Sequence, residues 1–455
     1  MRTVVVLMLA AAHAAAAQSA LGETPVMSLH QAIEFARTHQ PSLAAARARA
    51  EVAREQAKLP RAALTPTLTA AAEALVGTAN NTTASYATLG SFDVTRVGGT
   101  PANAPVSWSP EPSTLAGVSL HGEVFDFGRY EDQGDAFDAL ARAAGEDTNV
   151  EDLDLVLLVS DAFYAVQGAK AVLSASQAAA TRSREHRDFA KAGVDAQLRA
   201  PIELTRAEAD LARFEVDAVR AQGNLTVAQS VLAAAIGASA PTVDAGADDL
   251  VYSAPPPLDR SAKALDHDPA LRAARDRLAA QQSLTRSIRD ELRPDLSFSA
   301  ELTGRAGGAA VAADPTPAGG GWLPDVPNWD ALLVVTWPLF DRVVSVRANT
   351  SERVEAVRAA ELAQVSEQVA AFLQTTYVEL DVAQQALPAL QRSVDAATAN
   401  HAQADARFTA GLGNAVELAD SEALLVDAQI QLAIGQFQLS RARARVQRAL
   451  AAVSR

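Results

Sequence analysis

Few residues of this chain could do chemistry, and they are scattered. The sequence has seven histidines and no cysteine in 455 residues, which excludes disulfides, thiolate metal sites and a lipidated N-terminal cysteine. The histidines show no metal-ligand spacing. His267, between Asp266 and Asp268, has the most acidic neighbourhood, and we interpret this triplet as the solvated start of a helix. We therefore predict no catalytic residue, no cofactor and no metal site.

The stretch Gly411-Leu412-Gly413 is the second candidate for chemistry, as a phosphate-binding loop. It lacks both the preceding strand and the lysine of such a loop. It instead interrupts an amphipathic helical pattern, where each glycine costs about 1 kcal/mol relative to alanine. Asn414 is a good N-cap, and Glu417 follows three residues later, which approximates a capping box. The sequence therefore predicts a turn between two helices.

An internal repeat gives this turn a counterpart. The segment "APIELTRAEADL" (200–211) matches "NAVELADSEALL" (414–425), at an offset of 417 − 203 = 214. Pro201 stands at the first helical position, where its missing N–H costs nothing. Gly193 lies 203 − 193 = 10 residues before Glu203, whereas the second turn has only 417 − 411 = 6 residues between its first glycine and its glutamate. We therefore expect the first turn to be four residues longer.

The repeat extends over both halves of the chain. The motif "VFDFGR" aligns with "PLFDR", at an offset of 340 − 125 = 215 for the phenylalanines. Each half reads helix, strand, loop, strand, long helix, turn, long helix. We expect the first repeat at 18–235, a linker at 236–260 and the second repeat at 261–455, with the helical turns near 193–203 and 411–417.

The helices after the turns carry two adjacent apolar stripes. One steps strictly by seven, and its members are Leu418, Leu425, Leu432, Leu439 and Val446, repeated as Leu204, Leu211, Ala218, Leu225 and Leu232. A seven-residue period predicts left-handed supercoiling, and two stripes indicate that each helix contacts more than one neighbour. A bundle or a wall of helices fits this pattern, and an ordinary soluble bundle explains the stripes alone equally well.

Two pairs of β-strands interrupt the helices. We expect them near 64–78 and 113–126, and near 294–305 and 328–340, with a long loop rich in Gly, Pro, Asn and Thr inside each pair. All four tryptophans fall in or beside these strands. Aromatic girdles of a membrane barrel explain this placement, and so does core packing in a soluble sheet. Four strands cannot close a barrel, because the smallest single-chain outer-membrane barrels have about eight, so several copies would have to pool their strands.

The N-terminus has the pattern of a secretory signal peptide. Arg2 precedes an apolar run, and small residues lead to an expected cleavage site near Ala17. An N-terminal anchor helix would need about 20 apolar residues, more than this run contains. We expect no later membrane-spanning helix, since even the apolar segment 153–166 carries Asp154 and Asp161. The protein would then cross a membrane only as a β-barrel.

Composition and charge agree with long helices and give a weak indication of partners. The chain is 49% hydrophobic but only 5% aromatic, and its net charge is −15. Removal of Arg2 with the signal leaves −15 − 1 = −16. If this charge lined a channel, it would favour cations and repel nucleic acid. The surplus charge could equally be spread over solvated outer faces.

In these features the chain resembles the TolC-like outer-membrane efflux channels. The resemblance covers nearly all of the chain after the signal and rests on the order of the duplicated elements, including the strand starts "LTPTL" and "RPDLS". It implies a mainly α protein with a small β part. A homotrimer would close one twelve-stranded transmembrane β-barrel in outer-membrane lipid, and the paired helices would form a coiled-coil tunnel through the periplasm of a Gram-negative bacterium. The first half lacks the proline that Pro338 supplies in the second, which leaves its strand-to-helix bend undefined.

The resemblance also implies a function without chemistry. The protein would be the exit duct of a tripartite efflux or type I secretion system, working with a periplasmic adaptor (a membrane fusion protein) and an inner-membrane transporter. An adaptor itself would normally show one hairpin flanked by β-rich domains, so the duplication argues against it. A soluble or adhesive coiled-coil protein would lack the strand pairs.

Site residues follow from the same resemblance. Glu417 and Asp420, one helical turn apart, match the family's acidic constriction, although Glu417 could simply cap its helix. The adaptor-docking tips would include Gly193, Pro201, Gly411, Leu412 and Gly413. Gly413 stands where well-studied members carry an arginine, so part of their lock is absent. We hypothesise that Arg206 bridges to Glu417 or Asp420 in the closed pore. An intrahelical pair of Arg206 with Glu203 is the alternative.

Overall fold

The computed structural model describes residues 24–77, 108, 110–247, 255–258, 265–307, 323 and 326–454. The predicted signal peptide, 1–17, lies outside this part of the chain. The fold is mainly helical with a small sheet part. It divides into two compact units, one of residues 1–49, 144–273 and 363–455, and one of residues 50–143 and 274–362. These units cut across both sequence repeats.

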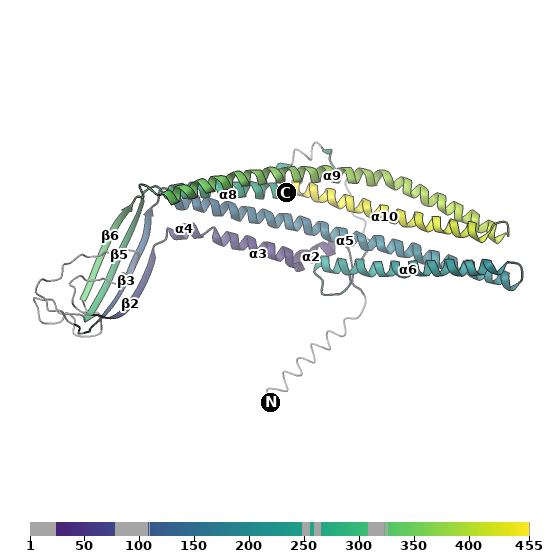
Figure 1. The fold of residues 1–455 in the computed structure, drawn as a ribbon, viewed down its shortest axis with the longest axis horizontal. Helices are drawn as coiled ribbons and strands as arrows, with labels where there is room; N and C mark the ends of the chain where they lie inside the picture. Colours follow the sequence, from purple (N-terminus) through teal and green to yellow (C-terminus); the bar gives the residue numbers. More distant parts are fainter. Residues whose placement is uncertain are drawn as a thin grey trace, which may run out of the picture. The chain divides into compact units, whose positions relative to one another are not determined.

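The second unit contains a four-stranded antiparallel sheet in the order β2-β3-β5-β6 (Figure 1). Its strands are β2 (Thr67–Gly77), β3 (Glu111–Phe125), β5 (Asp295–Gly307) and β6 (Val326–Thr336). Each repeat contributes one hairpin, and the two hairpins join through β3 and β5, where Ser119 pairs with Glu301. Within the described residues β2 and β6 are edge strands, each paired on one side only.

Large apolar side chains of this sheet are exposed in the single chain. Trp108, Trp329 and Trp337 are 88%, 78% and 59% exposed, whereas Trp322 lies outside the described residues. Exposed aliphatic residues on the strands are Leu68, Val76, Val118, Leu120, Leu302, Leu333 and Val335. Core packing within one soluble sheet would bury such residues, so the described tryptophans do not support that explanation.

The strand-to-helix junctions are set by two aspartates at equivalent repeat positions. The N–H of Tyr130 donates to Asp126 Oδ2 at 2.6 Å, where helix α5 (Arg129–Asp195) begins. The N–H of Val343 donates to Asp341 Oδ1 at 2.7 Å, where helix α9 (Arg342–Thr409) begins. The bend that lacks proline in the first repeat uses a β-bulge between Glu123 and Phe125 instead, followed by a left-handed Phe127 with φ of 55°. The aspartates of the "VFDFGR" and "PLFDR" motifs therefore start the long helices.

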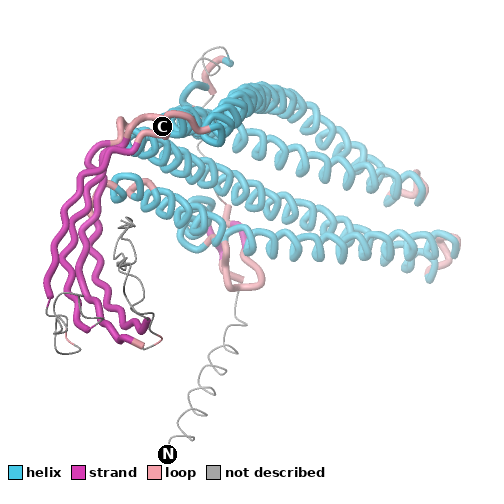
Figure 2. Tube along the Cα trace, turned by 60° about the vertical axis from the view of Figure 1, so that its left-hand side comes forward, coloured by secondary structure: helices cyan, strands magenta, loops and turns pink. Residues whose placement is uncertain are grey.

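The first unit is a helical assembly. Helix α5 turns into α6 (Pro201–Ile236), and α9 turns into α10 (Ala415–Ser454), as Figure 2 shows in cyan. The two hairpins pack together through Ala179 and Ala180 of α5, Phe214 of α6 and Val426 of α10. The predicted seven-residue stripe faces inward: Leu418, Leu425, Leu439 and Val446 are all at most 6% exposed. The smaller elements that belong to or reach into this unit are β1 (Val26–Met27), α2 (Leu29–His39), α3 (Pro41–Gln56), β4 (Asp244–Ala245) and α8 (Pro269–Asp290).

Short parallel strands complete this unit. Strand β1 pairs with β4, which lies in the predicted linker 236–260. Lys170 of α5 donates to Asp244 Oδ2 at 2.6 Å, and Gln229 of α6 donates to Asp244 Oδ1 at 2.9 Å. Burial alone would raise the pKa of Asp244, but the hydrogen bonds from Lys170 and Gln229 outweigh it and lower that pKa. The linker is thereby fastened to the hairpin α5–α6.

Helix α5 is apolar enough, by length and composition, to cross a membrane, with a mean hydropathy of 1.4 over its most apolar stretch. It is the one described helix that meets this criterion, so the expectation that no stretch would meet it was wrong. Val159, Phe163 and Val166 of this helix are fully buried in the core that it forms with α2 and α6. Burial inside the protein therefore accounts for its apolar character.

Candidate functional site at the helical tips

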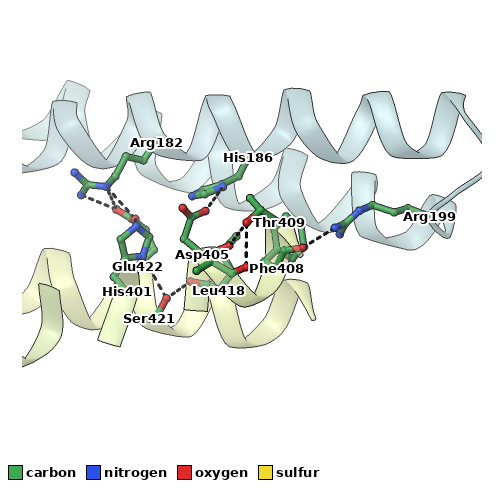
Figure 3. Close-up of polar contacts among 11 residues, drawn as sticks. Arg182, His186, Arg199, His401, Asp405, Phe408, Thr409, Leu418, Ser421 and Glu422 are labelled. Atoms are coloured by element: carbon green, nitrogen blue, oxygen red, sulfur yellow. Dashed lines mark hydrogen bonds and ion pairs between the residues drawn. The ribbon is translucent and has the colours of Figure 1, made fainter. Parts of the chain in front are cut away.

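The ends of the two hairpins carry the predicted site residues, and both lie in the first unit. Figure 3 shows polar contacts between the two hairpins near these ends. We call residues 193–203 the first tip and residues 409–417 the second tip. The first tip lies between α5 and α6, and the second between α9 and α10. A hydrogen bond from Arg199 to the backbone oxygen of Phe408 links the end of the first hairpin to the end of the second.

The first tip turns at a residue that is not glycine. Gln197 has φ of 62°, and Gly193 lies within the last turn of α5. A Cβ atom on Gly193 would lie 2.7 Å from Cδ of Arg199. Pro201 begins α6, and Ala200 precedes it without a side-chain cap. Gly193 thus leaves room for the side chain of Arg199, and Gln197 makes the turn.

The second tip follows the sequence pattern closely. Gly411 has φ of 73°, in the left-handed region that favours glycine, and helix α9 ends two residues earlier. The N–H groups of Leu412 and Gly413 both donate to the carbonyl oxygen of Arg407, at 2.8 and 2.9 Å. Asn414 caps α10, because its Oδ1 accepts the N–H of Glu417 at 2.8 Å. Leu412 is 76% exposed at the apex.

Arg199 fastens the two tips together, and the sequence analysis missed it. Its guanidinium donates to the carbonyl oxygen of Phe408 at 2.9 Å and to Glu203 Oε2 at 2.8 Å. It also lies over the Phe408 ring, 4.0 Å from the centroid, and near the Phe189 ring at 5.0 Å. Its side chain is only 14% exposed. Arg199 therefore supplies a cation at the tips, although the second tip has Gly413 where an arginine was expected.

The two predicted constriction carboxylates differ in their surroundings. Glu417 pairs with Arg407 at 3.2 Å, and both side chains are about half exposed. Asp420 is exposed, and within the described residues it has no ion pair. Part of the charge of Glu417 is thus neutralised inside its own chain, whereas Asp420 keeps its full negative charge.

Arg206 does not form the intrahelical pair with Glu203 that was the alternative to a gating role, because Glu203 pairs with Arg199. Arg206 is exposed, and the described part of the chain offers it no ion pair. Arg206 and Asp420 both act on Asp210. Burial raises the pKa of Asp210, the positive charge of Arg206 opposes this rise, and the negative charge of Asp420 adds to it. Arg206 and Asp420 therefore both lie near Asp210.

A buried polar cluster lies between the hairpins, close to the tips. Glu422 of α10 is 2% exposed and accepts hydrogen bonds from Arg182 of α5, at 2.8 Å from Nη2 and at 3.0 and 3.1 Å from Nε. His401 Nε2, on α9, lies 3.3 Å from Glu422 Oε2. This arrangement neutralises a buried carboxylate. Removal of one of its partners would leave an uncompensated buried charge.

His186 of α5 completes this cluster. Its Nδ1 lies 3.8 Å from Asp405 Oδ1, and its ring meets that of His401 edge to face at 6.1 Å. Its Nε2 is buried and finds no hydrogen-bond partner among the described residues. Burial lowers the pKa of His186, against the opposing effects of Asp405 and Glu422, which keeps the imidazole neutral near pH 7.

An open groove of about 530 Å³ lies between the tips. We call it the tip groove. Its lining includes Gly193, Arg199, Glu203, Gly411 and Gly413, together with Leu198. Leu198 is 83% exposed, and Ile202 and Leu412 nearby are 71% and 76% exposed. The tips therefore combine a concave surface with exposed apolar side chains.

The described part of the chain thus consists of two long helical hairpins joined near their tips and an antiparallel sheet with two open edges. The model of the family "Outer membrane efflux protein" matches residues 32–238 and 261–452, and the chain belongs to this family. It is thus a transport protein of the Gram-negative outer membrane that extends into the periplasm and serves as an exit duct for efflux.

Solved structures with a similar fold include outer-membrane channels. The chain is 16% identical to the Campylobacter jejuni channel CmeC, with a TM-score of 0.79 over 93% of this chain and 85% of that one. It is 17% identical to the Vibrio cholerae outer-membrane protein VceC, with a TM-score of 0.75 over 93% and 95%. A Pseudomonas aeruginosa membrane protein is 19% identical, with a TM-score of 0.76 over 94% and 91%. No match was found among curated protein sequences.

Proposed function

We propose that three copies of this chain form one duct, in which twelve strands close a β-barrel in the outer membrane. The open edges of the sheet carry this proposal. Unpaired edge strands are rarely left exposed, and closing a barrel removes them altogether. The exposed tryptophans and aliphatic side chains of the sheet would then face lipid and its boundary. The matched segments 32–238 and 261–452 support the division into repeats at 18–235 and 261–455.

Apolar side chains along the helices support contacts between copies. Those that one chain leaves exposed are Val216, Val219, Val227 and Val231 of α6, Val357, Val378 and Val382 of α9, and Leu424 of α10. A soluble monomer rarely exposes such extended apolar rows. In the proposed trimer these residues would pack helices of neighbouring copies into the wall of a periplasmic tunnel.

The two tips, with the tip groove between them, are the proposed docking site for a periplasmic adaptor, and this site includes Gly193, Pro201, Gly411, Leu412 and Gly413. Exposed Leu198, Ile202 and Leu412 would supply the apolar contacts. An inner-membrane transporter would provide the energy and the substrate, and the duct itself would only open. Within the trimer, Arg206 would bridge to Glu417 or Asp420 when the pore is closed.

Cysteine cross-linking between the sheet edges tests the proposed barrel. The natural chain has no cysteine, so Thr69→Cys in β2 can be combined in turn with a cysteine at each position of β6 from 330 to 336. We expect oxidation to join chains covalently up to a trimer for the β6 positions that oppose Thr69. Double variants with both cysteines in β2 are the control. Cross-linking that stops at dimers, or that fails at all seven positions, would contradict a closed barrel of three copies.

A further inference from the structure

We propose that His186, His401 and Glu422 bind a divalent transition metal of the zinc class, and that this metal joins the two hairpins of one chain near their tips. The three side chains come from α5, α9 and α10. The proposal goes beyond the duct function, since the metal would be a structural ion of the chain and no part of its cargo.

The donor atoms are already gathered. One ligand atom from each of the three residues lies within 4.8 Å of the other two. His401 Nε2 and Glu422 Oε2 are 3.3 Å apart, close to the separation of two ligands that each lie about 2.1 Å from one tetrahedral zinc ion. His186 would have to approach by up to about 1.4 Å to bind the same ion, because two ligands of one tetrahedral zinc ion lie about 3.4 Å apart. This movement breaks no hydrogen bond of its Nε2, because that atom has no partner among the described residues.

The surroundings of both histidines are those of metal ligands. A ligating histidine normally directs its other ring nitrogen to a carboxylate or another polar group, which fixes the ring. Here Nδ1 of His186 faces Asp405 at 3.8 Å, and Nδ1 of His401 lies 3.3 Å from Ser421 Oγ. The hydroxyl of Ser421 itself donates to the carbonyl oxygen of Leu418 at 2.7 Å. Each Nε2 is therefore the nitrogen that is directed into the cluster.

The charged side chains of the cluster sum to a net negative charge, which a divalent cation would balance. Arg182 contributes one positive charge, while Glu422 and Asp405 contribute two negative charges. Arg182 donates to both oxygens of Glu422, from Nη2 and Nε to Oε1 and from Nε to Oε2, and Oε2 also faces His401. Two imidazoles and one carboxylate suit Zn²⁺ and Co²⁺ better than Mg²⁺ or Ca²⁺, which prefer oxygen ligands.

The purified full-length protein, treated with a chelator and then dialysed, allows a direct test with Co²⁺ as the probe. We expect one Co²⁺ per chain, with intense visible absorption bands from a low-coordinate site, and displacement of these bands by Zn²⁺. His186→Asn and His401→Asn should each abolish the bands, and Asp405→Asn should weaken Co²⁺ binding about tenfold or more. His267→Asn and His30→Asn, at exposed histidines outside the cluster, are the matched controls.

Several outcomes would overturn the proposal. A Co²⁺ spectrum identical to that of the aqueous ion would do so, whatever the variants show. Binding that survives unchanged in both cluster variants, or that is lost equally in His267→Asn, would also exclude the site. If a cluster variant fails to fold, as judged by circular dichroism and chromatography, the spectrum of the natural protein alone decides.

Arg182→Gln separates a metal site from a purely polar network. This variant removes the cation that competes for Glu422 and leaves the other ligands in place. A metal site predicts tighter Co²⁺ binding, by about tenfold, and a Zn²⁺-dependent rise in thermal stability larger than that of the natural protein. A polar network predicts only destabilisation that Zn²⁺ does not reverse, and that result would count against the proposal.

Discussion

The tips depend on single side chains whose partners lie in the other hairpin. Arg199 is the clearest case, because its guanidinium donates to the carbonyl oxygen of Phe408 and lies over the Phe408 ring, while its contact with Glu203 stays within the first tip. Each hydrogen bond that involves a charged group contributes about 1.5–3 kcal/mol when it is well shielded from water. The connection between the tips therefore rests largely on this residue.

Arg199→Ala should loosen the first tip while the trimer remains intact. The lost contacts predict at least about tenfold faster hydrogen exchange of the backbone amides of 193–203, since 1.4 kcal/mol corresponds to a factor of ten. Exchange measured by mass spectrometry checks this. Lys191→Ala is the matched control, because Lys191 is an exposed cation near the first tip that has no ion pair within the described residues. Equal exchange in both variants would contradict the role of Arg199.

Measurements on Arg206→Ala test whether a bridge from Arg206 holds the pore closed. If Arg206 bridges between copies, Arg206→Ala should raise the resting conductance and the leak of antibiotics in cells without adaptor. A closed conductance equal to that of the natural protein would exclude the bridge. Each isolated bridge contributes only about 0–1 kcal/mol, so three of them would bias the gate without blocking it.

The turn residues and stripes could be predicted from the sequence, but the residues that join the tips could not. Gly411 and Asn414 act locally, so their types alone indicate a turn and a cap. Arg199 contacts Phe408, 408 − 199 = 209 residues away, and no local pattern records such a contact. One signal was overlooked: the offset between His186 and His401, 401 − 186 = 215, equals the repeat offset 340 − 125 = 215.

At the level of elements, the strands and helices lie where the sequence pattern predicted them, and their observed ends differ from the predicted ends by a few residues. Strand β3 begins at Glu111 and β6 ends at Thr336, against expected ranges of 113–126 and 328–340. Helix α9 spans 342–409. The first tip was harder to predict, because a left-handed turn at Gln197 leaves no glycine signature.

Gly411→Val should disturb the second tip and weaken docking of an adaptor without weakening the trimer. The backbone at Gly411 is left-handed, and a residue with a Cβ atom costs about 1–2 kcal/mol there, more when it is β-branched. No atom lies within 4 Å of the added Cβ, so the effect comes from the backbone alone. Gly411→Asn, which tolerates this conformation, is the control. Cross-linking to a co-expressed adaptor measures docking, and loss of the trimer with docking intact would contradict the prediction.

The junction of β4 with α5 should make stability depend on pH. The pKa of Asp244 is lower in the folded chain than the ordinary value of about 3.9 expected when it is unfolded. Its stabilising contribution is therefore present above the unfolded pKa and is lost as the pH falls through the folded pKa. Lys170→Met should lower the thermal midpoint near pH 7 more than near pH 3. An equal loss at both pH values would show that the ion pair does not contribute.

At the level of the whole molecule, a trimer would arrange Glu417 and Asp420 as rings around the pore. Asp420→Asn should reduce the preference for cations and the block by divalent ions more than Glu417→Gln does, because Arg407 already neutralises part of the Glu417 charge. Single-channel recordings measure both effects, and we expect a several-fold drop in the cation-to-anion permeability ratio for Asp420→Asn. Unchanged selectivity in the double variant would place these residues away from the pore.

The open sheet edges also determine how the protein must be made. A newly exported copy carries strands that hydrogen-bond on one side only, with Leu68, Trp329 and Leu333 exposed to water. Such edges are templates for aggregation. We therefore expect each copy to be held by a periplasmic chaperone until three copies meet at the membrane. An excess of single chains would then harm the cell during assembly of the protein, before any transport takes place.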